Sequence, residues 1–174
     1  MANTWRATTQ AAAYGANKHM LDVFNAAAST RAIRCYRFYL LNNQTAAITG
    51  VLNFVQIMRN TAASAGTTVT PVAHDPNNSA LNANSTAGTG RTITTGATLR
   101  RILSQNDEPT VTTLDMDALL TLIPFSEIWN AGYGDTNIQA LACPIGSNIG
   151  YSIQSITATT GTADCEIEFT DAAS

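Results

Sequence analysis

Residues 164–170 read Asp-Cys-Glu-Ile-Glu-Phe-Thr, and this is the most regular alternation of apolar and polar residues in the chain. Cys165, Ile167 and Phe169 fall at every second position, with polar residues between them. Successive side chains of a β-strand point to opposite faces of a sheet. The pattern therefore predicts a strand over 163–170 with one buried face and one acidic, solvated face.

Other stretches predict further strands. Residues 31–41 are rich in aromatic and β-branched types, and Tyr36, Phe38 and Leu40 are expected to share one face of that strand. A turn at 42–45 precedes a predicted strand over 48–59, although the spacing of its apolar residues also fits a helix. The remaining strand candidates are 67–72, 92–94, 98–103, 137–144 and 150–157; residues 115–122 fit a short helix or an extended stretch.

Short strands separated by turns, without long helices between them, are typical of an antiparallel β-sandwich or jelly roll. A chain of 174 residues has the length of one domain. We therefore predict an all-β, jelly-roll-like antiparallel β-sandwich over 31–174, with a long polar insertion at about 60–98 that lies in a surface loop or contacts a neighbouring chain. Residues 1–30 are expected to form an extended N-terminal arm, in which 17–25 fits either helical turns or a strand.

The composition excludes several classes of function. Charged residues make up 12% of the chain, which is about half the usual share, and Lys18 is the single lysine. A net charge of −3 argues against dedicated nucleic-acid binding, and no apolar run is long enough to span a membrane. The N-terminus lacks the apolar core of a signal peptide. A surface with so few charges fits a protein that packs against copies of itself or against a partner.

The cysteines predict no disulfide framework. The chain has three cysteines, Cys35, Cys143 and Cys165, so they cannot all pair with one another. None lies in a Cys-x-x-Cys spacing. Each lies among apolar or alternating residues. We expect buried, unpaired thiols in a protein made in a reducing cytosol.

Residues that could carry chemistry are few. His74 and Asp75 precede a proline and are expected to shape a turn. Glu166 and Glu168 would lie about 7 Å apart on one strand face, which resembles a glycosidase pair in spacing alone. No Gly-x-Ser-x-Gly, Walker A, dinucleotide-binding or EF-hand pattern occurs. The sequence therefore predicts no enzymatic activity, no catalytic residue, no cofactor and no metal.

Partner contacts are expected instead at the N-terminal arm and at the one basic cluster. A tryptophan on a polar arm is a suitable anchor, unless it folds back on its own domain. The arginines of 31–37 would contact an acidic patch on a partner, or they are solvated or paired locally. The candidate contact residues are Trp5, Arg6, Tyr14, Arg31, Arg34 and Arg37.

Short motifs are spread over most of the chain. They are Asn17-Lys18-His19, Arg34-x-x-Arg37, Thr49-Gly50-Val51, Arg59-Asn60-Thr61, the stretch Gly66-Thr67-Thr68-Val69-Thr70-Pro71-Val72 followed by His74-Asp75, Leu99-Arg100-Arg101 and Ile167-Glu168-Phe169-Thr170. Together they resemble a class of small structural proteins of tailed bacteriophages that are encoded beside capsid genes.

The resemblance implies a virion protein, namely a capsid decoration (cement) protein with a β-rich body. It implies binding to the major capsid protein and to copies of itself, as a homotrimer or homodimer, on the capsid surface after synthesis in the host cytoplasm. Another head or tail component is an alternative within this class. A carbohydrate-binding or adhesin-like sandwich is an alternative from another class. Its aromatic platform would consist of Trp5, Trp129, Tyr133 and Tyr151.

Overall fold

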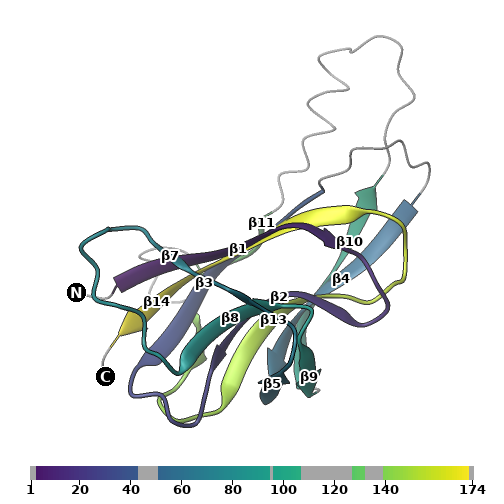
Figure 1. Ribbon diagram of the computed structural model, residues 1–174. Helices are drawn as coiled ribbons and strands as arrows, with labels where there is room; N and C mark the ends of the chain where they lie inside the picture. Colours follow the sequence, from purple (N-terminus) through teal and green to yellow (C-terminus); the bar gives the residue numbers. More distant parts are fainter. Residues whose placement is uncertain (1–2, 43–50, 95, 107–126, 132–138, 173–174) are drawn as a thin grey trace.

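Two antiparallel β-sheets face each other across one apolar core (Figure 1). The computed structural model describes residues 3–42, 51–94, 96–106, 127–131 and 139–172. Every regular secondary-structure element among these residues is a β-strand, which confirms the predicted all-β antiparallel sandwich. Its jelly-roll connectivity stays a prediction. None of the described segments is a helix long and apolar enough to cross a membrane.

The first sheet, here called sheet A, has the strand order β11-β3-β14-β1-β7, and β12 also pairs with β3. The N-terminal and C-terminal strands are neighbours at its centre, since Asn3 pairs with Asp171. The strands of sheet A are β1 (Asn3–Ala13), β3 (Ala32–Asn42), β7 (Val72–Ala73), β11 (Glu127–Asn130), β12 (Leu141–Cys143) and β14 (Thr162–Ala172).

The second sheet, sheet B, has the order β10-β4-β13-β2-β8-β6. A small separate ribbon pairs β5 (Ala62–Ser64) with β9 (Thr92–Thr94). The strands of sheet B are β2 (Lys18–Asn25), β4 (Val51–Asn60), β6 (Thr67–Val69), β8 (Ser85–Thr89), β10 (Ala97–Asn106) and β13 (Ile149–Ser155).

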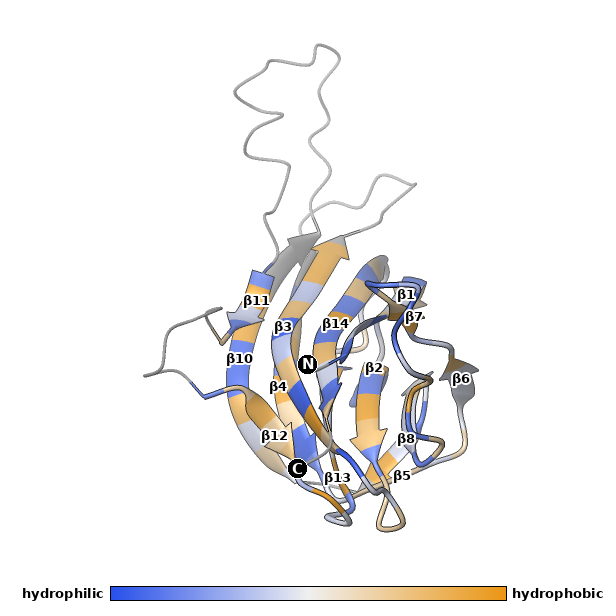
Figure 2. Cartoon of the chain, turned by 90° about the vertical axis from the view of Figure 1, so that its left-hand side faces the viewer, coloured by the Kyte–Doolittle hydropathy of each residue, from blue (hydrophilic) through white to orange (hydrophobic). Residues whose placement is uncertain are grey.

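Alternating side chains from both sheets fill the core, and the strands carry the corresponding bands of high and low hydropathy (Figure 2). The strand predicted over 163–170 is confirmed as part of β14, whose Cys165, Ile167 and Phe169 are buried. The opposite sheet contributes buried residues of β2, β4 and β13. Examples are Leu21, Val23, Val55, Ile57 and Ile153.

The N-terminal segment is not an arm. β1 pairs with β14 on one side and with β7 on the other, and residues 18–25 form β2 inside sheet B. Trp5 and Ala7 enter the core from β1. The expected extended arm over 1–30 is therefore wrong for the described residues 3–30, because alternate residues of this segment bury apolar surface between the sheets. Residues 17–25, which fitted a helix or a strand, are a strand over most of their length.

The stretch 60–98 is not a polar insertion as a whole. Its β8 pairs with β2 and with β6, and it buries Ala87 in the core. Its β7 forms one margin of sheet A. Small and polar residues can join a sheet because the ladder is made by backbone hydrogen bonds. The segment thus completes the edges of both layers.

One extra residue in β3 changes which of its side chains face the core. Cys35 lies opposite Phe169, but Arg37 lies opposite Glu168, so the register with β14 skips Tyr36. Such a β-bulge shifts the alternation by one residue. Phe38 therefore points into the core with Cys35, whereas the sequence pattern placed them on opposite faces.

The other predicted strands are largely confirmed. Residues 92–94, 98–103 and 150–157 correspond to β9, β10 and β13, although β13 ends at Ser155. The strand over 48–59 is confirmed from residue 51 onward, and that over 67–72 is divided into β6 and β7. The strand over 137–144 is confirmed as the shorter β12. Residues 48–50, 115–122, 137 and 138 lie outside the described residues.

The three cysteine thiols are buried and free, as expected. Cys35 lies on β3, and Cys143 lies on the adjacent β12, where it pairs with Ile33. Burial, together with the neighbouring Cys143 thiol, raises the pKa of Cys35 well above its usual value. Burial likewise raises the pKa of Cys165. Cys35 and Cys165 are therefore protonated core groups.

Candidate interaction surfaces

Two of the six candidate contact residues are core residues. Trp5 is 8% exposed and Tyr14 is 6% exposed. Trp5 lies between Phe169 of β14 and Ala73 of β7 in the register of sheet A. A side chain with so little exposed surface has almost nothing to offer a partner. Trp5 and Tyr14 are therefore corrected from partner contacts to parts of the sandwich core.

Arg6 and Arg37 belong to a band of charges on the outer face of sheet A. The Arg6 Nη1 atom lies 3.7 Å from the Glu166 carboxylate, and the Arg37 Nη1 atom lies 3.5 Å from the Glu168 carboxylate. The His74 Nε2 atom lies 3.8 Å from the other carboxylate oxygen of Glu168. The Glu168 side chain is only 12% exposed. The acidic strand face is thus partly covered and matched by cations, and it is less solvated than the sequence suggested.

Arg31 is also paired within the chain, whereas Arg34 faces solvent. The Arg31 Nη1 atom lies 3.2 Å from the fully buried Asp171 carboxylate and donates to the carbonyl oxygen of Ala80. Arg34 is exposed on β3, and no residue in the described ranges forms an ion pair with it. Arg34 and the outward side of Arg6 remain the accessible members of the predicted set.

The aromatic platform proposed for a sugar-binding protein is not assembled. Trp5 and Tyr151 are both buried, and the Tyr151 hydroxyl donates a hydrogen bond to the carbonyl oxygen of Ala142. Trp129 is partly buried against the core, and Tyr133 lies outside the described residues. Since a sugar platform needs exposed aromatic faces, this prediction is wrong for Trp5 and Tyr151.

His74 and Asp75 shape a turn, as predicted. The Asp75 carboxylate accepts a hydrogen bond of 2.8 Å from the backbone N–H of Asn77. The backbone N–H of His74 donates to the carbonyl oxygen of Thr4, which ties the turn to β1. The imidazole points to Glu168 and the Asp75 carboxylate to Asn77, so the two side chains have different partners.

Sequence reasoning missed a buried polar network on the outer face of sheet B. The His19 Nδ1 atom lies 2.9 Å from the Ser152 hydroxyl, and its Nε2 atom lies 3.1 Å from the Gln154 amide. Gln56 continues the network, since its amide donates to Gln154 at 2.5 Å. Burial lowers the pKa of His19 to about 4, so the imidazole is neutral at pH 7.

The His19–Ser152 contact resembles a base beside a nucleophile, but its setting differs. The Ser152 side chain has no exposed surface, so a substrate cannot reach the hydroxyl in this arrangement. The second imidazole nitrogen meets an amide, whereas a catalytic triad places a carboxylate there. The network therefore links strands β2, β4 and β13 and orients their side chains.

A buried ion pair lies beside this network. The Arg91 Nη1 atom is 3.2 Å from the Asp22 carboxylate, and the guanidinium also donates to the Thr86 hydroxyl and to the carbonyl oxygen of Ala87. Burial raises the pKa of Asp22 to about 7, and the charge of Arg91 opposes that shift. Arg91 thereby fastens the segment before β9 onto sheet B.

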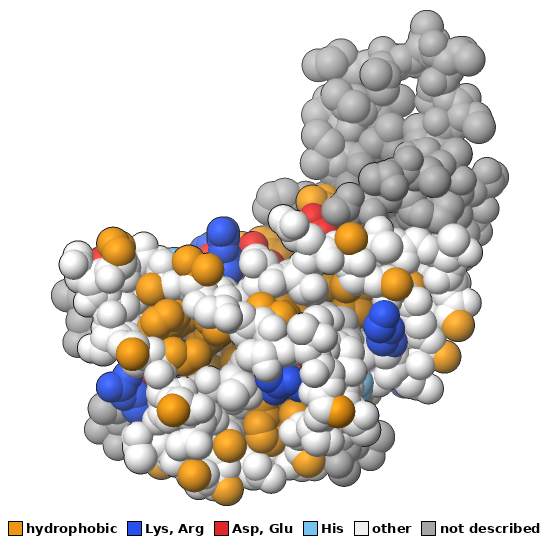
Figure 3. All heavy atoms as spheres, viewed as in Figure 1, with side chains coloured by type: hydrophobic (Ala, Val, Ile, Leu, Met, Phe, Trp, Pro, Cys, Tyr) orange, Lys and Arg blue, Asp and Glu red, His pale blue; other side chains and the backbone are white. Residues whose placement is uncertain are grey.

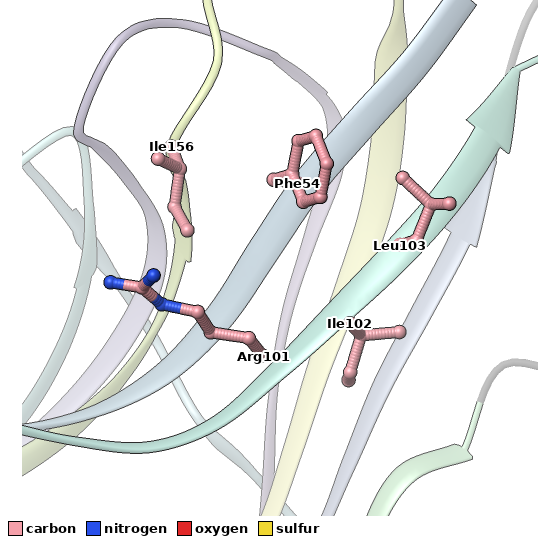
Figure 4. Close-up of a pocket in the computed structure, with 5 residues that line it drawn as sticks. All are labelled: Phe54, Arg101, Ile102, Leu103 and Ile156. Carbon is pink, nitrogen blue, oxygen red and sulfur yellow. The ribbon is translucent and has the colours of Figure 1, made fainter.

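An open apolar groove lies at the β4–β10 margin of sheet B (Figure 4). Phe54 and Leu103 are cross-strand partners, and they are 45% and 53% exposed. The backbone N–H of Ile156 donates to the carbonyl oxygen of Phe54, so the segment after β13 closes one side. The groove has a volume of about 240 Å³. It is lined by Phe54, Arg101, Ile102, Leu103 and Ile156.

The same margin is basic. Arg59 of β4 and Arg100 and Arg101 of β10 are exposed, and neither strand contains an acidic residue. The Arg101 Nε atom donates to the Gln56 side chain at 3.2 Å. No carboxylate among the residues with described positions pairs with these three arginines. The adjacent arginines were visible in the sequence, but their place at a sheet margin was not.

No family model, curated protein or solved structure matches the chain. The function of the chain is therefore inferred from these surfaces and from the motifs of the sequence. The exposed margin formed by β4 and β10 is the strongest candidate for partner binding, because it combines contiguous apolar side chains with arginines that no described carboxylate pairs.

Proposed function

We propose that the protein is a non-enzymatic structural protein of a bacteriophage virion, a decoration (cement) protein that binds and stabilises the outside of the capsid shell. The observation that carries this proposal is the exposed apolar groove of Phe54, Leu103 and Ile156. Clustered apolar side chains cost free energy in water and typically mark a surface that another molecule covers. The motif resemblance supplies the class of partner, which is the major capsid protein.

The composition of the surface supports the same proposal. On the face seen in Figure 3, charged side chains are few, in keeping with a charged content of 12%. A protein that occupies many equivalent positions on a shell needs a repeated contact of modest size. Outside the basic β4–β10 margin, an uncharged polar surface can be covered with little loss of ion hydration.

The contacts proposed for the shell differ from those expected from the sequence. Trp5 and Tyr14 stabilise the protein itself, so the shell contact is assigned to the β4–β10 margin. Self-association into a closed dimer or trimer is part of the proposal, since symmetric closure is the usual form of homo-oligomers.

Sedimentation with capsids tests this function. The native mass of the purified protein is measured first, and the protein is then mixed with shells that lack it and with free capsid subunits. We expect an oligomer that sediments with shells only. Leu103→Asp should abolish this binding, while Val72→Asp, which adds the same charge at a residue 62% exposed on sheet A, should preserve it. A monomer that stays in the supernatant would contradict the proposal.

A further inference from the structure

Strand β10 is a long free edge. It pairs with β4 from Ala97 opposite Arg59 to Asn106 opposite Val51, and no other described strand pairs with its second side (Figures 1 and 2). Among the described strands, its 10 residues leave a row of backbone N–H and C=O groups without a sheet partner. Such an edge is a ready template for an added strand, and natural proteins usually shorten or cover it.

The side chains of β10 give this edge a repeated pattern on both faces. Arg101 and Leu103 lie opposite Gln56 and Phe54 and share the outer face of sheet B with them. Arg100 and Ile102 lie opposite Ile57 and Val55 and share the other face. Each face therefore presents an arginine and, two residues later, an apolar side chain.

We propose that the free edge of β10 docks an extended segment of another protein as an added antiparallel strand, with two apolar residues followed by two acidic residues. In that order the apolar residues lie beside Leu103 and Ile102, and the carboxylates lie beside Arg101 and Arg100. One apolar side chain enters the groove against Phe54. The charge of the edge supports an acidic occupant, since β4 and β10 carry three arginines and no acidic residue.

A second copy of this chain fits the edge less well. Two β10 strands paired edge to edge would gather the arginines of both copies at one seam, with no carboxylate on β10 or β4 of either copy. Like charges at a sheet seam repel each other and disfavour that pairing. A heterologous acidic segment instead satisfies the backbone edge, the arginines and the apolar groove together.

The inference deepens the proposed function, on which it rests for the assignment of the segment to a capsid protein. The strand-docking step itself is tested with a peptide, so the two proposals can fail separately. If the peptide binds at β10 but shells do not bind, the inference stands and the proposed function fails. If shells bind and the peptide does not, the proposed function stands and the inference fails.

The test uses the full chain and the synthetic peptide Thr-Val-Val-Glu-Glu-Thr with blocked ends. Fluorescence anisotropy measures the affinity, and amide hydrogen exchange measures protection of β10. We expect saturable binding together with slower exchange in β10. A matched peptide with lysine in place of glutamate should not bind. Equal affinity for both peptides, or binding that leaves exchange in β10 unchanged, would overturn the inference.

Variants of the protein give the second arm of the test. Arg101→Glu should weaken peptide binding about tenfold, because a repulsion replaces an attraction at the docked carboxylate. Arg34→Glu makes the same charge change on sheet A and should leave the affinity unchanged. Arg100→Glu provides an independent variant, and thermal melts verify that each variant is folded. Equal affinities for all the variants would contradict the proposed docking.

Other occupants of the edge are recognised in the same experiments. A dimer of the free protein that Leu103→Asp dissociates would show that a second copy covers β10. Peptide binding that appears only after the acidic residues within 107–126 are replaced by their amides would show that the chain covers its own edge. Binding of a single-stranded oligonucleotide in place of the peptide would identify a nucleic-acid site. Each of these three results overturns the inference.

Discussion

The guanidinium of Arg91 lies 3.2 Å from the carboxylate of Asp22, and the two side chains are 9% and 1% exposed. The pair joins the segment that enters β9 to β2 in sheet B. Breaking a buried ion pair from one side leaves an uncompensated charge, which costs about 3–5 kcal/mol in comparable proteins. Gly88 makes this geometry possible, because it lies opposite Asp22 in the register and the guanidinium occupies the space of its missing side chain.

We predict that Gly88→Ala destabilises the protein through Arg91. The new Cβ would overlap the guanidinium, so Arg91 must move away and leave Asp22 behind. We expect a loss of about 2–4 kcal/mol in the free energy of unfolding, measured with urea. In the Arg91→Ala background the same substitution should cost much less, since the obstacle is gone. Additive effects in this double-mutant cycle would disprove the mechanism.

Asp22 and His19 have opposite effects on the dependence of stability on pH. The pKa of Asp22 is raised from 3.8 to about 7, so the folded state binds more protons than the unfolded state between these values. Its contribution is therefore full below pH 3.8 and is lost as the pH rises through about 7. The pKa of His19 is lowered from 6.5 to about 4, so its contribution is full above pH 6.5 and is lost as the pH falls through about 4.

These opposite slopes predict how two variants differ from the wild type. In Asp22→Asn, the His19 contribution remains, so the free energy of unfolding should rise more steeply than in the wild type as the pH rises from 4 to 6.5. In His19→Gln, the Asp22 contribution remains, and stability should fall relative to the wild type as the pH rises from 4 to 7. Urea unfolding at a series of pH values measures both slopes. Parallel curves for all three proteins would rule out this assignment.

Asn25 joins three segments of the chain, around Arg31, Ser85 and Cys143–Pro144, and is predicted to be essential for stability. It is fully buried, and its Oδ1 atom accepts a hydrogen bond of 2.8 Å from the Ser85 hydroxyl. Asn25→Ala should therefore lower the free energy of unfolding by about 2–4 kcal/mol, because buried groups lose their partners. The Nδ2 atom of Asn25 lies within 3.1 Å of the carbonyl oxygens of Arg31, Cys143 and Pro144.

The control for this prediction is Asn77→Ala. Asn77 lies in an exposed turn, where water can replace its side-chain contact with Asp75. Its loss should change the free energy of unfolding by about 0.5 kcal/mol or less. Comparable losses for the two variants in urea would show that burial does not decide the effect.

Strand identity could be predicted where the signal is local. The alternation around Ile167 reflects one buried face, and it is visible without knowledge of the partner strand. In β1 the same alternation exists, but Ala7 and the surrounding threonines differ little in hydropathy, so the alternation is hard to see in the sequence. The strand that completes the burial of Trp5 lies at the other end of the chain, which explains why the segment resembled an arm.

The surfaces could not be predicted because they depend on pairings between distant segments. His19 and Ser152 are 133 residues apart, and no local pattern relates them. The bulge at Tyr36 exists only relative to β14. Arg101 was read as part of a motif, but its exposure at a free edge follows from the order of strands in sheet B. The low content of charged residues could be predicted from the composition. The excess of arginines over acidic residues at the β4–β10 margin could not.

The stability of a Trp5 variant tests whether β1 is a core strand or a binding arm. Trp5→Ala should lower the free energy of unfolding by about 3–5 kcal/mol, because it empties a large site in the core. Arg6→Ala, at the next position and on the exposed face, removes an ion pair of 3.7 Å at a side chain that is 51% exposed, and should cost about 1 kcal/mol at most. Urea unfolding compares the two variants. An arm that reaches a partner would give the reverse result, with Trp5→Ala as stable as the wild type and impaired only in sedimentation with shells; that outcome would contradict the place of β1 in sheet A.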